Sequence, residues 1–270
     1  MEVKFIKASP TMTLLIETPV AREKQLAVAE RLIAYGSVYA EQAGYIEEAE
    51  NPAAEKRLQM MAGEFCGNAS LSLAAWLAQK KNLQIGEKTE ITLEVSGAEE
   101  LVRCEMKREA EHRFLGRVAM PLPQTIEKRA FTLDGERIEL TAVVFAGITH
   151  ILVPASLWGE NAVRKAEHAA RVWAKELPPV FGLLLFDEKE KSLKPLVAVG
   201  DVSLIWERGC GSGTSAVGAY LAAREKKDVT VSLKQPGGVM HATVSYQNGA
   251  VTKIEITGSV AIVAEGTAYL

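Results

Sequence analysis

The sequence is poor in the residues that build a disulfide framework or a metal site. Its 270 residues include three cysteines, at positions 66, 104 and 210, and contain no Cys-X-X-Cys pair. An odd number of widely spaced cysteines argues against paired disulfides and against a zinc site. The four histidines also lack metal-ligand spacing. We therefore expect a reduced protein without a metal, whose cysteines are either buried or reactive thiols.

Long apolar runs and clusters of one charge are also missing. No stretch reaches 18 consecutive apolar residues, and the apolar segment Met12–Ile16 is too short for a signal peptide, so we expect no membrane partner and a cytoplasmic location. The net charge of −3 offers no basic surface for nucleic acid. The glycine-rich segment around Cys210 lacks the Gly-Lys-Ser/Thr ending of a phosphate loop. A nucleotide or nucleic-acid partner is therefore not expected.

Strand-like alternation dominates the sequence, and helical periodicity is confined to a few segments. The apolar spacing predicts helices over Glu23–Ala40 and Asn161–Leu177, and two more helices open with the glycine-containing segments GEFCGNAS and RGCGSGTS. The predicted strands are Phe5–Glu17, Leu58–Met61, Ile91–Val95, Leu101–Met106, Phe114–Met120, Phe131–Leu133, Arg137–Phe145, Ile151–Val153, Val180–Phe186, Leu196–Glu207, Val229–Leu233, Val239–Tyr246, Val251–Thr257 and Val260–Ala264. Many short strands and few helices favour the α+β class.

The two glycine-opened helices resemble each other. Aligned without gaps from Cys66 and Cys210, CGNASLSLAAWLAQKK faces CGSGTSAVGAYLAARE, at an offset of 210 − 66 = 144 residues. Both are rich in small apolar residues all round, as buried helices are. Chance similarity between two alanine-rich helices is the alternative. The shared Cys-Gly start favours two pseudo-symmetric domains, each a strand-rich, barrel-like shell around a central helix.

A proline-marked segment, MPLPQ from Met120 to Gln124, is a candidate domain boundary. We predict an N-terminal domain of residues 1–118 that carries Cys66 and is completed by a C-terminal strand near residues 260–270. Residues 119–259 form the second predicted domain, which carries Cys210. Cys104 lies in a predicted strand, and we expect it to be structural.

A cysteine at a helix N-terminus is suited to acid–base chemistry. The first turn exposes unpaired N–H groups and roughly half a positive charge, which favours a thiolate and attracts a carboxylate. If the two helix starts face each other, the amides of Gly67, Asn68, Gly211 and Ser212 would hold one α-carboxylate, with one sulfur on each side of the α-carbon. That arrangement predicts a racemase that uses one thiolate as base and one thiol as acid.

These motifs resemble the diaminopimelate epimerase-like superfamily, which also includes proline racemases and phenazine-pathway isomerases. The matching segments are Cys66-Gly67-Asn68, Glu207-Arg208-Gly209, Cys210-Gly211-Ser212-Gly213, Pro236-Gly237-Gly238, Thr257-Gly258-Ser259 and Glu265-Gly266. The resemblance implies the diaminopimelate epimerase-like fold, a cofactor-independent isomerase and a homodimer. It also implies that Cys66 and Cys210 are catalytic and that Glu207, with Arg208 beside it, receives the substrate α-ammonium. Asn68, Gly211 and Ser212 would then bind the α-carboxylate.

The departures from the epimerase pattern concern the distal end of the substrate. Thr11, Met60 and Gly182 stand near positions where the epimerase has asparagines, and its Gly-Asn-Pro-His becomes Gly-Ile-Thr-His, ending at His150. The loss of those asparagines removes the polar partners of a distal zwitterion and disfavours diaminopimelate. The pattern is similar to the histidine racemases of staphylopine-type opine metallophore biosynthesis. It implies interconversion of L- and D-histidine, with Thr11, Met60 and His150 near the side chain.

Three alternatives remain. Diaminopimelate epimerase or another amino-acid epimerase of the same fold is the first. A phenazine-type isomerase is the second, and the paired cysteines disfavour it because that subfamily uses a carboxylate. The third, non-enzymatic alternative is an amino-acid-binding or thiol-sensing protein.

Overall fold

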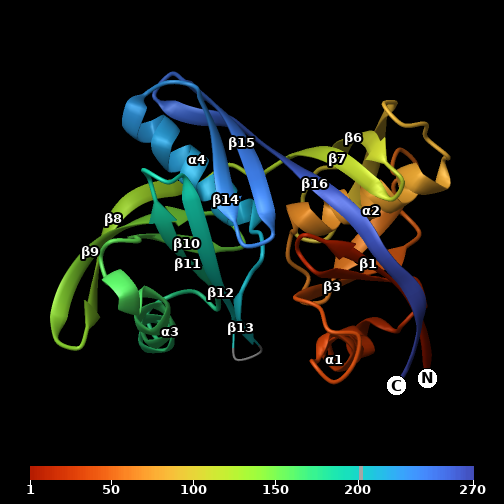
Figure 1. Ribbon diagram of the computed structural model, residues 1–270, viewed down its shortest axis with the longest axis horizontal. Coiled ribbons are helices and arrows are strands. Elements are labelled where there is room, and N and C mark those ends of the chain that lie inside the picture. Colours follow the sequence, from red (N-terminus) through yellow and green to blue (C-terminus); the bar gives the residue numbers. More distant parts are fainter. Residues whose placement is uncertain (201–202) are drawn as a thin grey trace. The chain divides into compact units, whose positions relative to one another are not determined.

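The computed structural model describes residues 1–200 and 203–270 of a chain that divides into two compact units. Unit 1 comprises Met1–Ala119 and Thr257–Leu270, and unit 2 comprises Met120–Ile256. Strands outnumber helices in both units, which confirms the predicted mixed α+β class (Figure 1). The pseudo-symmetry of the two units stays a prediction. None of the described helices is long and apolar enough to cross a lipid bilayer.

The strands of unit 1 form a closed ring. In spatial order they are β1 (Glu2–Ser9), β2 (Thr13–Ile16), β3 (Gln42–Glu47), β4 (Lys56–Met60), β5 (Lys88–Val95), β6 (Val102–Ala110), β7 (Arg113–Ala119) and the C-terminal part of β16 (Ala250–Tyr269). The ring closes because β16 also pairs antiparallel with β1, from Glu2 opposite Tyr269 to Ser9 opposite Ala261. Helix α2 (Gly67–Lys80) packs against β2 to β7, so the barrel-like shell has this helix at its centre.

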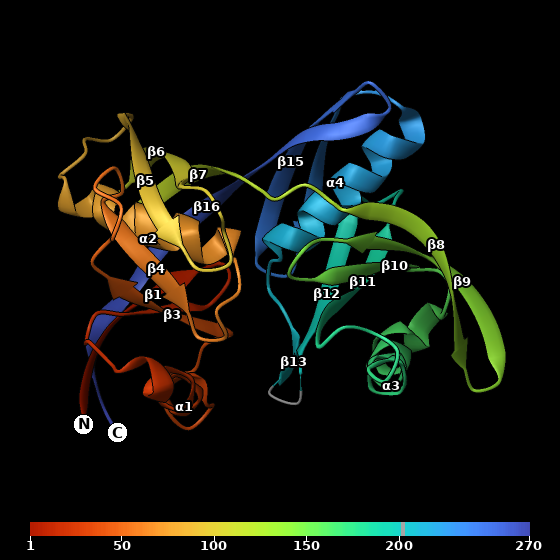
Figure 2. The ribbon, with the colours of Figure 1, turned by 180° about the vertical axis from the view of Figure 1, so that it is seen from behind.

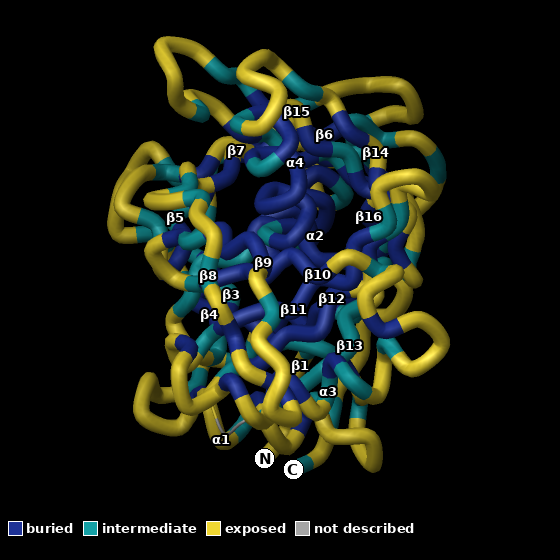
Figure 3. The backbone as a smooth tube through the Cα atoms, turned by 90° about the vertical axis from the view of Figure 1, so that its left-hand side faces the viewer, coloured by how far each residue is buried: buried dark blue, intermediate teal, exposed yellow. Residues whose placement is uncertain are grey.

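The α2 helix is buried along most of its length. Between Gly67 and Ala78 every residue except Asn68 is buried (Figure 3). Small residues make this close packing possible: a Cβ added at Gly116 of β7 would lie 2.7 Å from Leu71 Cδ2. The all-round apolar sequence of this helix is thus explained by a surrounding sheet. Cys104 of β6 is fully buried in the same unit, and burial raises the pKa of its thiol.

A second helix of unit 1 lies outside the ring. Helix α1 (Arg22–Ile33) places Leu32 and Ala29 in a cluster with residues of β1, β2 and β3. It ends seven residues before the predicted Ala40. The carbonyls of Leu32 and Ile33 accept hydrogen bonds from Val38 and Ala40 of the returning loop instead of from a further helical turn, which ends the helix at Ile33.

The sheet of unit 2 contains, in spatial order, the first part of β16, then β15 (Gly238–Gln247), β14 (Val229–Gln235), β12 (Ser192–Val199), β11 (Val180–Asp187), β10 (Thr149–Pro154), β9 (Glu136–Val144) and β8 (Thr125–Leu133). Strand β13 (Ser203–Trp206) pairs with β12. Helices α3 (Ala162–Trp173) and α4 (Gly211–Glu225) lie on opposite sides of strands β10 to β12 (Figure 2).

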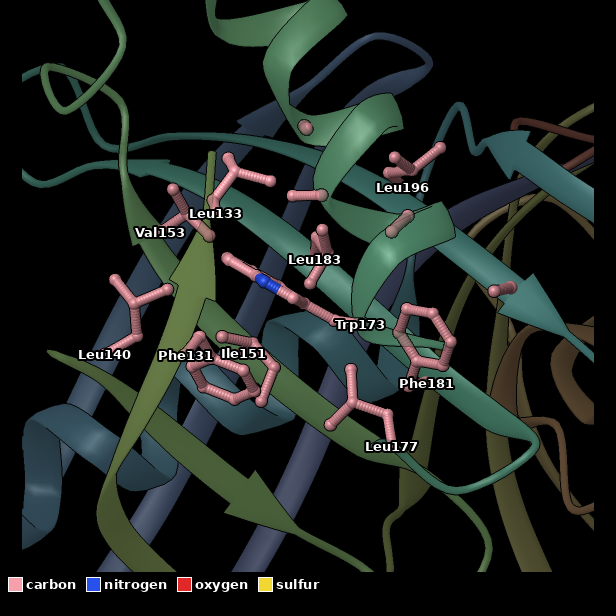
Figure 4. Close-up of a cluster of buried hydrophobic side chains, with 14 of the residues drawn as sticks. Phe131, Leu133, Leu140, Ile151, Val153, Trp173, Leu177, Phe181, Leu183 and Leu196 are labelled. Atoms are coloured by element: carbon pink, nitrogen blue, oxygen red, sulfur yellow. The ribbon is translucent and has the colours of Figure 1, made fainter. Parts of the chain in front are cut away.

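The buried run of β11 explains how this sheet supports a helix on each face. Alternate residues point to opposite faces of a strand. Phe181, Leu183 and Leu185 therefore join the apolar cluster around Trp173 of α3 (Figure 4). Leu184 points the other way and lies 3.0 Å from where a Cβ on Gly213 of α4 would be.

Four predicted strands were divided differently from the observed ones. The predicted strand Phe5–Glu17 is two strands, because Pro10 in the intervening turn has no N–H to continue the ladder. The predicted strand Leu196–Glu207 is also two strands, β12 and β13, and its residues 201–202 lie outside the described residues. The opposite error affects the C-terminus, where the two strands predicted at Val251–Thr257 and Val260–Ala264 are the single strand β16.

Candidate active site

Helices α2 and α4 each begin at a cysteine. Cys66 and Cys210 are the N-cap residues of α2 and α4, with extended backbones of φ −135°, ψ 106° and φ −118°, ψ 112°. Each sulfur accepts a hydrogen bond from the backbone N–H three residues on, Ala69 N at 3.4 Å and Gly213 N at 3.3 Å. Cysteine thus takes the role that Ser, Thr, Asp or Asn has at most helix N-termini. The helix dipole favours the thiolate form of a sulfur held there.

The same hydrogen bond to the backbone is found after each cysteine. The Ser70 hydroxyl donates to the Cys66 carbonyl at 2.9 Å, and the Thr214 hydroxyl donates to the Cys210 carbonyl at 2.6 Å. The similarity between the two helices in the sequence therefore extends to their caps and first-turn hydrogen bonds. In both, the second residue of the helix, Asn68 or Ser212, is the partly exposed one among buried neighbours.

In unit 1, a chain of polar side chains leads away from Cys66. The Cys66 thiol, which is partly exposed, donates to Gln42 Oε1 at 3.3 Å. Gln42 Nε2 donates to Thr13 Oγ1 at 2.8 Å, and Thr13 Oγ1 donates to the Thr11 carbonyl at 2.8 Å. Thr11 is thereby connected to Cys66 through two intervening side chains.

The loop that carries Cys66 is held by the turn after β5. Ser96 Oγ donates to the Glu64 carbonyl at 2.9 Å, two residues before Cys66. Gly97 has a φ of +71°, and a Cβ at this position would lie 2.4 Å from Phe65 N. Only glycine fits here, because both the backbone conformation and the adjacent loop exclude a side chain.

Met60, predicted near the substrate side chain, is fully buried at the end of β4. Its N–H donates to Ser96 Oγ at 2.9 Å, and its sulfur lies 3.1 Å from where a Cβ on Gly44 would be. Gly67 is buried, and the Asn68 carbonyl accepts from Ser72 Oγ at 2.9 Å. The assignment of Met60 and Asn68 as substrate contacts stays a prediction.

In unit 2, Cys210 is buried and lies beside a carboxylate. Burial is the largest influence and raises the pKa of its thiol well above the ordinary value. The charge of Glu207 and a hydrogen bond to its side chain raise this pKa further, whereas hydrogen bonds from Ser212 and the Gly213 amide lower it. The Cys210 sulfur lies 3.4 Å from Ser212 Oγ. The thiol form is therefore favoured, first by burial and then by the charge of Glu207.

His150 is fully buried and its ring contacts Ser212. Its Nε2 is 2.9 Å from Ser212 Oγ, while its Nδ1 has no hydrogen-bond partner among the described residues. Burial lowers the pKa of His150 to about 3, so its ring is neutral near pH 7. A buried unpaired N–H costs more than an unpaired lone pair, which places the proton on Nε2, donating to Ser212. The Ser212 hydroxyl is then free to donate to the Cys210 sulfur.

Gly182 of β11 makes room for this histidine. A Cβ at position 182 would lie 2.4 Å from His150 Nδ1. The position where the resemblance placed a substrate-binding asparagine in diaminopimelate epimerase is therefore filled here by the imidazole ring of His150.

The segment before Cys210 is held by the β14–β15 turn. Cys210 N donates to Gln235 Oε1 at 2.8 Å, and Gln235 Nε2 donates to Thr214 Oγ1 at 2.7 Å. Gly237 N donates to the carbonyl of Arg208, an exposed residue, at 2.6 Å. The predicted Pro-Gly-Gly and Glu-Arg-Gly motifs are thus in contact through the backbone.

Sequence reasoning missed Gln42, Ser96 and Gln235, although each contacts a cysteine or the loop that carries one. Each is a polar residue at or next to a strand end, and this was the signal that could have suggested a supporting role. Within residues 1–200 and 203–270, no three His, Cys, Asp or Glu side chains lie close enough together to hold a metal ion.

Solved structures with the same fold include racemases, epimerases and phenazine-biosynthesis proteins. A hydroxyproline epimerase from Agrobacterium vitis is 13% identical with a TM-score of 0.69, over 99% of this chain and 92% of that chain. A PhzF-family protein from Bacillus anthracis is 15% identical with a TM-score of 0.69, over 100% of this chain and 99% of that chain. At such low identity the likeness shows the fold alone.

Relatives in sequence define the class: this chain is an isomerase, an amino-acid racemase. A histidine racemase from Fusobacterium nucleatum subsp. nucleatum is 32% identical, over 98% of this chain and 97% of the relative, and one from Staphylococcus aureus is 27% identical, over 99% and 98%. The family described as "Histidine racemase CntK N-terminal domain" matches residues 2–269. The chain belongs to this histidine racemase family.

Proposed function

We propose that the protein interconverts L- and D-histidine by a two-base mechanism in which Cys66 and Cys210 act on opposite faces of the α-carbon. The observation that carries this proposal is the pair of matched helix starts, each capped by a cysteine sulfur. The histidine racemases that match almost the whole chain support the substrate.

In this mechanism the helix N-termini bind the substrate. The amides of Gly67, Asn68, Gly211 and Ser212 hold the α-carboxylate, because a helix N-terminus offers unpaired N–H groups and a positive dipole end. Glu207 receives the α-ammonium. That ion pair neutralises the Glu207 charge, which is one cause of the raised Cys210 pKa. Burial, the larger cause, remains, so substrate binding makes the thiol easier to ionise.

The chemical step moves one proton off the α-carbon and another onto it. One thiolate takes the Cα proton, and the bond electrons remain on carbon as a carbanion beside the bound carboxylate. The opposite thiol then gives its proton to the other face. Each turnover exchanges the roles of the two sulfurs, and the amides that hold the carboxylate stabilise the developing charge. No external oxidant, reductant or cofactor enters this balance.

Two neighbours in unit 2 support a substrate without a distal zwitterion. His150 fills the space beside Gly182 and is neutral near pH 7, so neither residue offers a charge to a distal carboxylate or ammonium. We further propose that the D-histidine product feeds opine metallophore biosynthesis and that the protein acts as a homodimer. Both proposals follow from the family resemblance.

The test is deuterium exchange at Cα in D₂O with L-histidine, diaminopimelate and L-proline, followed by chiral chromatography and mass spectrometry. We expect histidine to gain one deuterium and to reach equal amounts of both enantiomers. Cys66→Ser and Cys210→Ser should each lower kcat at least 1,000-fold, on the order of the loss when an acid–base group is removed, whereas Cys104→Ser should keep turnover. Full activity of either site variant would refute the two-base scheme, and binding without exchange would favour the non-enzymatic alternative.

A further inference from the structure

The side-chain amide of Gln42 is held in one orientation by its neighbours. Thr13 Oγ1 lies 2.8 Å from the Thr11 carbonyl, and a carbonyl oxygen can only accept, so the single hydroxyl hydrogen of Thr13 points there. Towards Gln42, 2.8 Å away, Thr13 can therefore only accept. The amide must direct Nε2 to Thr13 and Oε1 to the Cys66 sulfur at 3.3 Å.

This orientation specifies the protonation state of the sulfur. An amide oxygen can only accept, so it stabilises Cys66 as a thiol that donates S–H. A thiolate in the same place would face the negative end of the amide dipole. Loss of the Cys66 proton therefore favours a rotated amide, with Nε2 directed to the sulfur and Oε1 to Thr13, which must then turn its hydroxyl away from Thr11.

Burial makes the chain of hydrogen bonds selective. Thr13 is 0% exposed and Thr11 is 5% exposed. Water cannot replace a partner at these two residues, and a buried polar group without a partner costs about 1–3 kcal/mol. Arrangements in which one end of the Gln42 amide meets a partner that cannot bond with it are therefore disfavoured. The Gln42 amide therefore has two orientations in which both of its ends are paired, one matched to the thiol and one matched to the thiolate, and the second costs the Thr11 carbonyl its Thr13 donor.

We propose that Gln42, oriented by Thr13, is a hydrogen-bond switch that reverses direction each time Cys66 gains or loses its proton. Both are positioning residues, since they act through Cys66. The switch transfers no proton itself: the Cys66 proton goes to or comes from the α-carbon. The two hydrogen bonds of Gln42 reverse direction, and the Thr13 hydroxyl leaves the Thr11 carbonyl. This inference rests on the proposed acid–base role of Cys66 and adds the means by which unit 1 accommodates both forms of its sulfur.

Other ionisable groups around Cys66 must stay constant in the test. They include Glu64 in the same loop, where burial raises the pKa of the carboxyl, and Glu41 next to Gln42. The first turn of α2 contains no acidic residue. The substitutions below leave all of these groups in place.

The experiment measures how fast iodoacetamide labels Cys66 as a function of pH, with each cysteine resolved by peptide mass spectrometry. In Thr13→Val the acceptor that holds Nε2 is lost, so the amide can turn its N–H to the sulfur and the thiolate is stabilised. We expect the labelling midpoint to fall by about one pH unit, which is about tenfold faster labelling at low pH. Thr13→Ser keeps the hydroxyl and should keep the wild-type midpoint.

Gln42→Glu should have the opposite effect. A carboxylate cannot donate to sulfur and adds a like charge, so the Cys66 midpoint should rise and labelling near pH 8 should slow severalfold. Opposite shifts from two changes in one network are not expected of a merely structural role. An unchanged midpoint in Thr13→Val, a shift of equal size in Thr13→Ser, or a lowered midpoint in Gln42→Glu would each overturn the proposal.

Labelling requires neither substrate nor turnover. A protein that fails to racemise histidine but shows the opposite shifts would refute the proposed function and leave the switch intact. A racemase with no shifts would refute the switch alone. If Thr13→Val fails to fold, the shift of the Cys66 labelling midpoint in Gln42→Glu still tests the proposal. Gln42 is at the partly exposed end of the hydrogen-bond chain, so its substitution should be tolerated.

Discussion

At the scale of single residues, the two cysteines have different surroundings although their caps are alike. Cys66 faces an amide oxygen, while Cys210 faces a hydroxyl and lies beside the Glu207 carboxylate. The Gln42 amide oxygen favours the thiol of Cys66, and burial together with the Glu207 charge favours the thiol of Cys210 despite the hydroxyl. In the proposed mechanism, binding of the substrate ammonium to Glu207 would remove one cause of the raised Cys210 pKa, so this thiol would be less reactive between turnovers than during them.

The influence of Glu207 on Cys210 is directly testable. Its negative charge raises the pKa of the Cys210 thiol, so Glu207→Gln should lower that pKa. The iodoacetamide labelling midpoint of Cys210 should move to lower pH by about one unit or more, since one unit corresponds to about 1.4 kcal/mol. In the same variant the KM for histidine should rise at least tenfold, because the α-ammonium loses its partner.

Glu160→Gln is the matched control for Glu207→Gln. Glu160 is an exposed carboxylate of the same unit, in the short 3₁₀ helix before α3, and its removal changes the net charge equally. Labelling of Cys210 should be unaffected. A Cys210 midpoint that stays at the wild-type value in Glu207→Gln would contradict the electrostatic account.

Residue positions were predictable only where the chemistry lies within one short segment. Cys66 and Cys210 were predicted at helix starts because the Cys-Gly opening and the apolar helix that follows are local patterns. Gln42 and Gln235 could not be predicted, since their contacts depend on which strand lies beside which helix. Gln42 is 24 residues from Cys66 and Gln235 is 25 residues from Cys210 along the chain. The catalytic role of each cysteine stays a prediction.

At the scale of elements, each cysteine-bearing loop is supported by a neighbouring turn. Ser96 and Gly97 hold the loop before α2, and Gln235 and Gly237 hold the segment before α4. A catalytic thiol must be positioned closely, because a displacement of about 1 Å can cost about 100-fold in rate. These turns are therefore part of the site although they are remote from it in sequence.

Gly97→Ala tests this support in unit 1. The new Cβ would lie 2.4 Å from Phe65 N, which is backbone and cannot turn aside, and the φ of +71° adds strain. The loop must shift, so we expect kcat to fall about 10- to 100-fold and the free energy of unfolding to fall by about 2 kcal/mol. Steady-state racemisation and urea unfolding measure the two effects.

Gly86→Ala separates strain from displacement. Gly86 is also in unit 1 and has a φ of +91°, but a Cβ there meets no atom within 4 Å. It should lose about 1 kcal/mol of stability from backbone strain and keep its kcat. Equal losses of kcat in the two variants would show that the Ser96–Gly97 turn does not position Cys66.

Element types were easier to predict than element limits. The predicted helix at Glu23–Ala40 ends at Ile33 because the following loop satisfies the last carbonyls, a contact that periodicity cannot reveal. The single strand β16 was predicted as two strands, one on each side of Gly258 and Ser259. In the structure these residues continue one extended ladder, and β16 has neighbours in both units.

At the scale of the whole molecule, the two units are interleaved along the chain. The chain leaves unit 1 after Ala119 and returns to it at Thr257, and the returning segment pairs with β1. The shell around α2 is thus assembled from the two ends of the sequence. Unit 1 cannot complete its ring until the last strand has been synthesised, so its folding depends on contacts of the longest possible sequence separation.

Removal of residues 261–270 should therefore open the ring of unit 1. The deletion removes all eight register partners of β1 on β16 and the buried side chain of Ile262. It exposes an unpaired edge on β1 and opens the ring of strands around α2. The expected loss of several kcal/mol is comparable with the total stability of a domain, about 5–15 kcal/mol. Cys66 should then label rapidly and Cys104, which is otherwise fully buried, should label as well.

A shorter deletion provides the comparison. Loss of Tyr269 and Leu270 removes an exposed aromatic side chain, a partly buried leucine and two backbone hydrogen bonds with Met1. It leaves the pairing of Val3 with Ala268 and of Ser9 with Ala261. The labelling of Cys104 should then stay slow, and the unfolding midpoint should change little. Because Cys104 lies in the core of unit 1, its labelling rate reports the closure of that ring specifically. Slow labelling of Cys104 after the ten-residue deletion would mean that β1 to β7 hold α2 without the C-terminal strand.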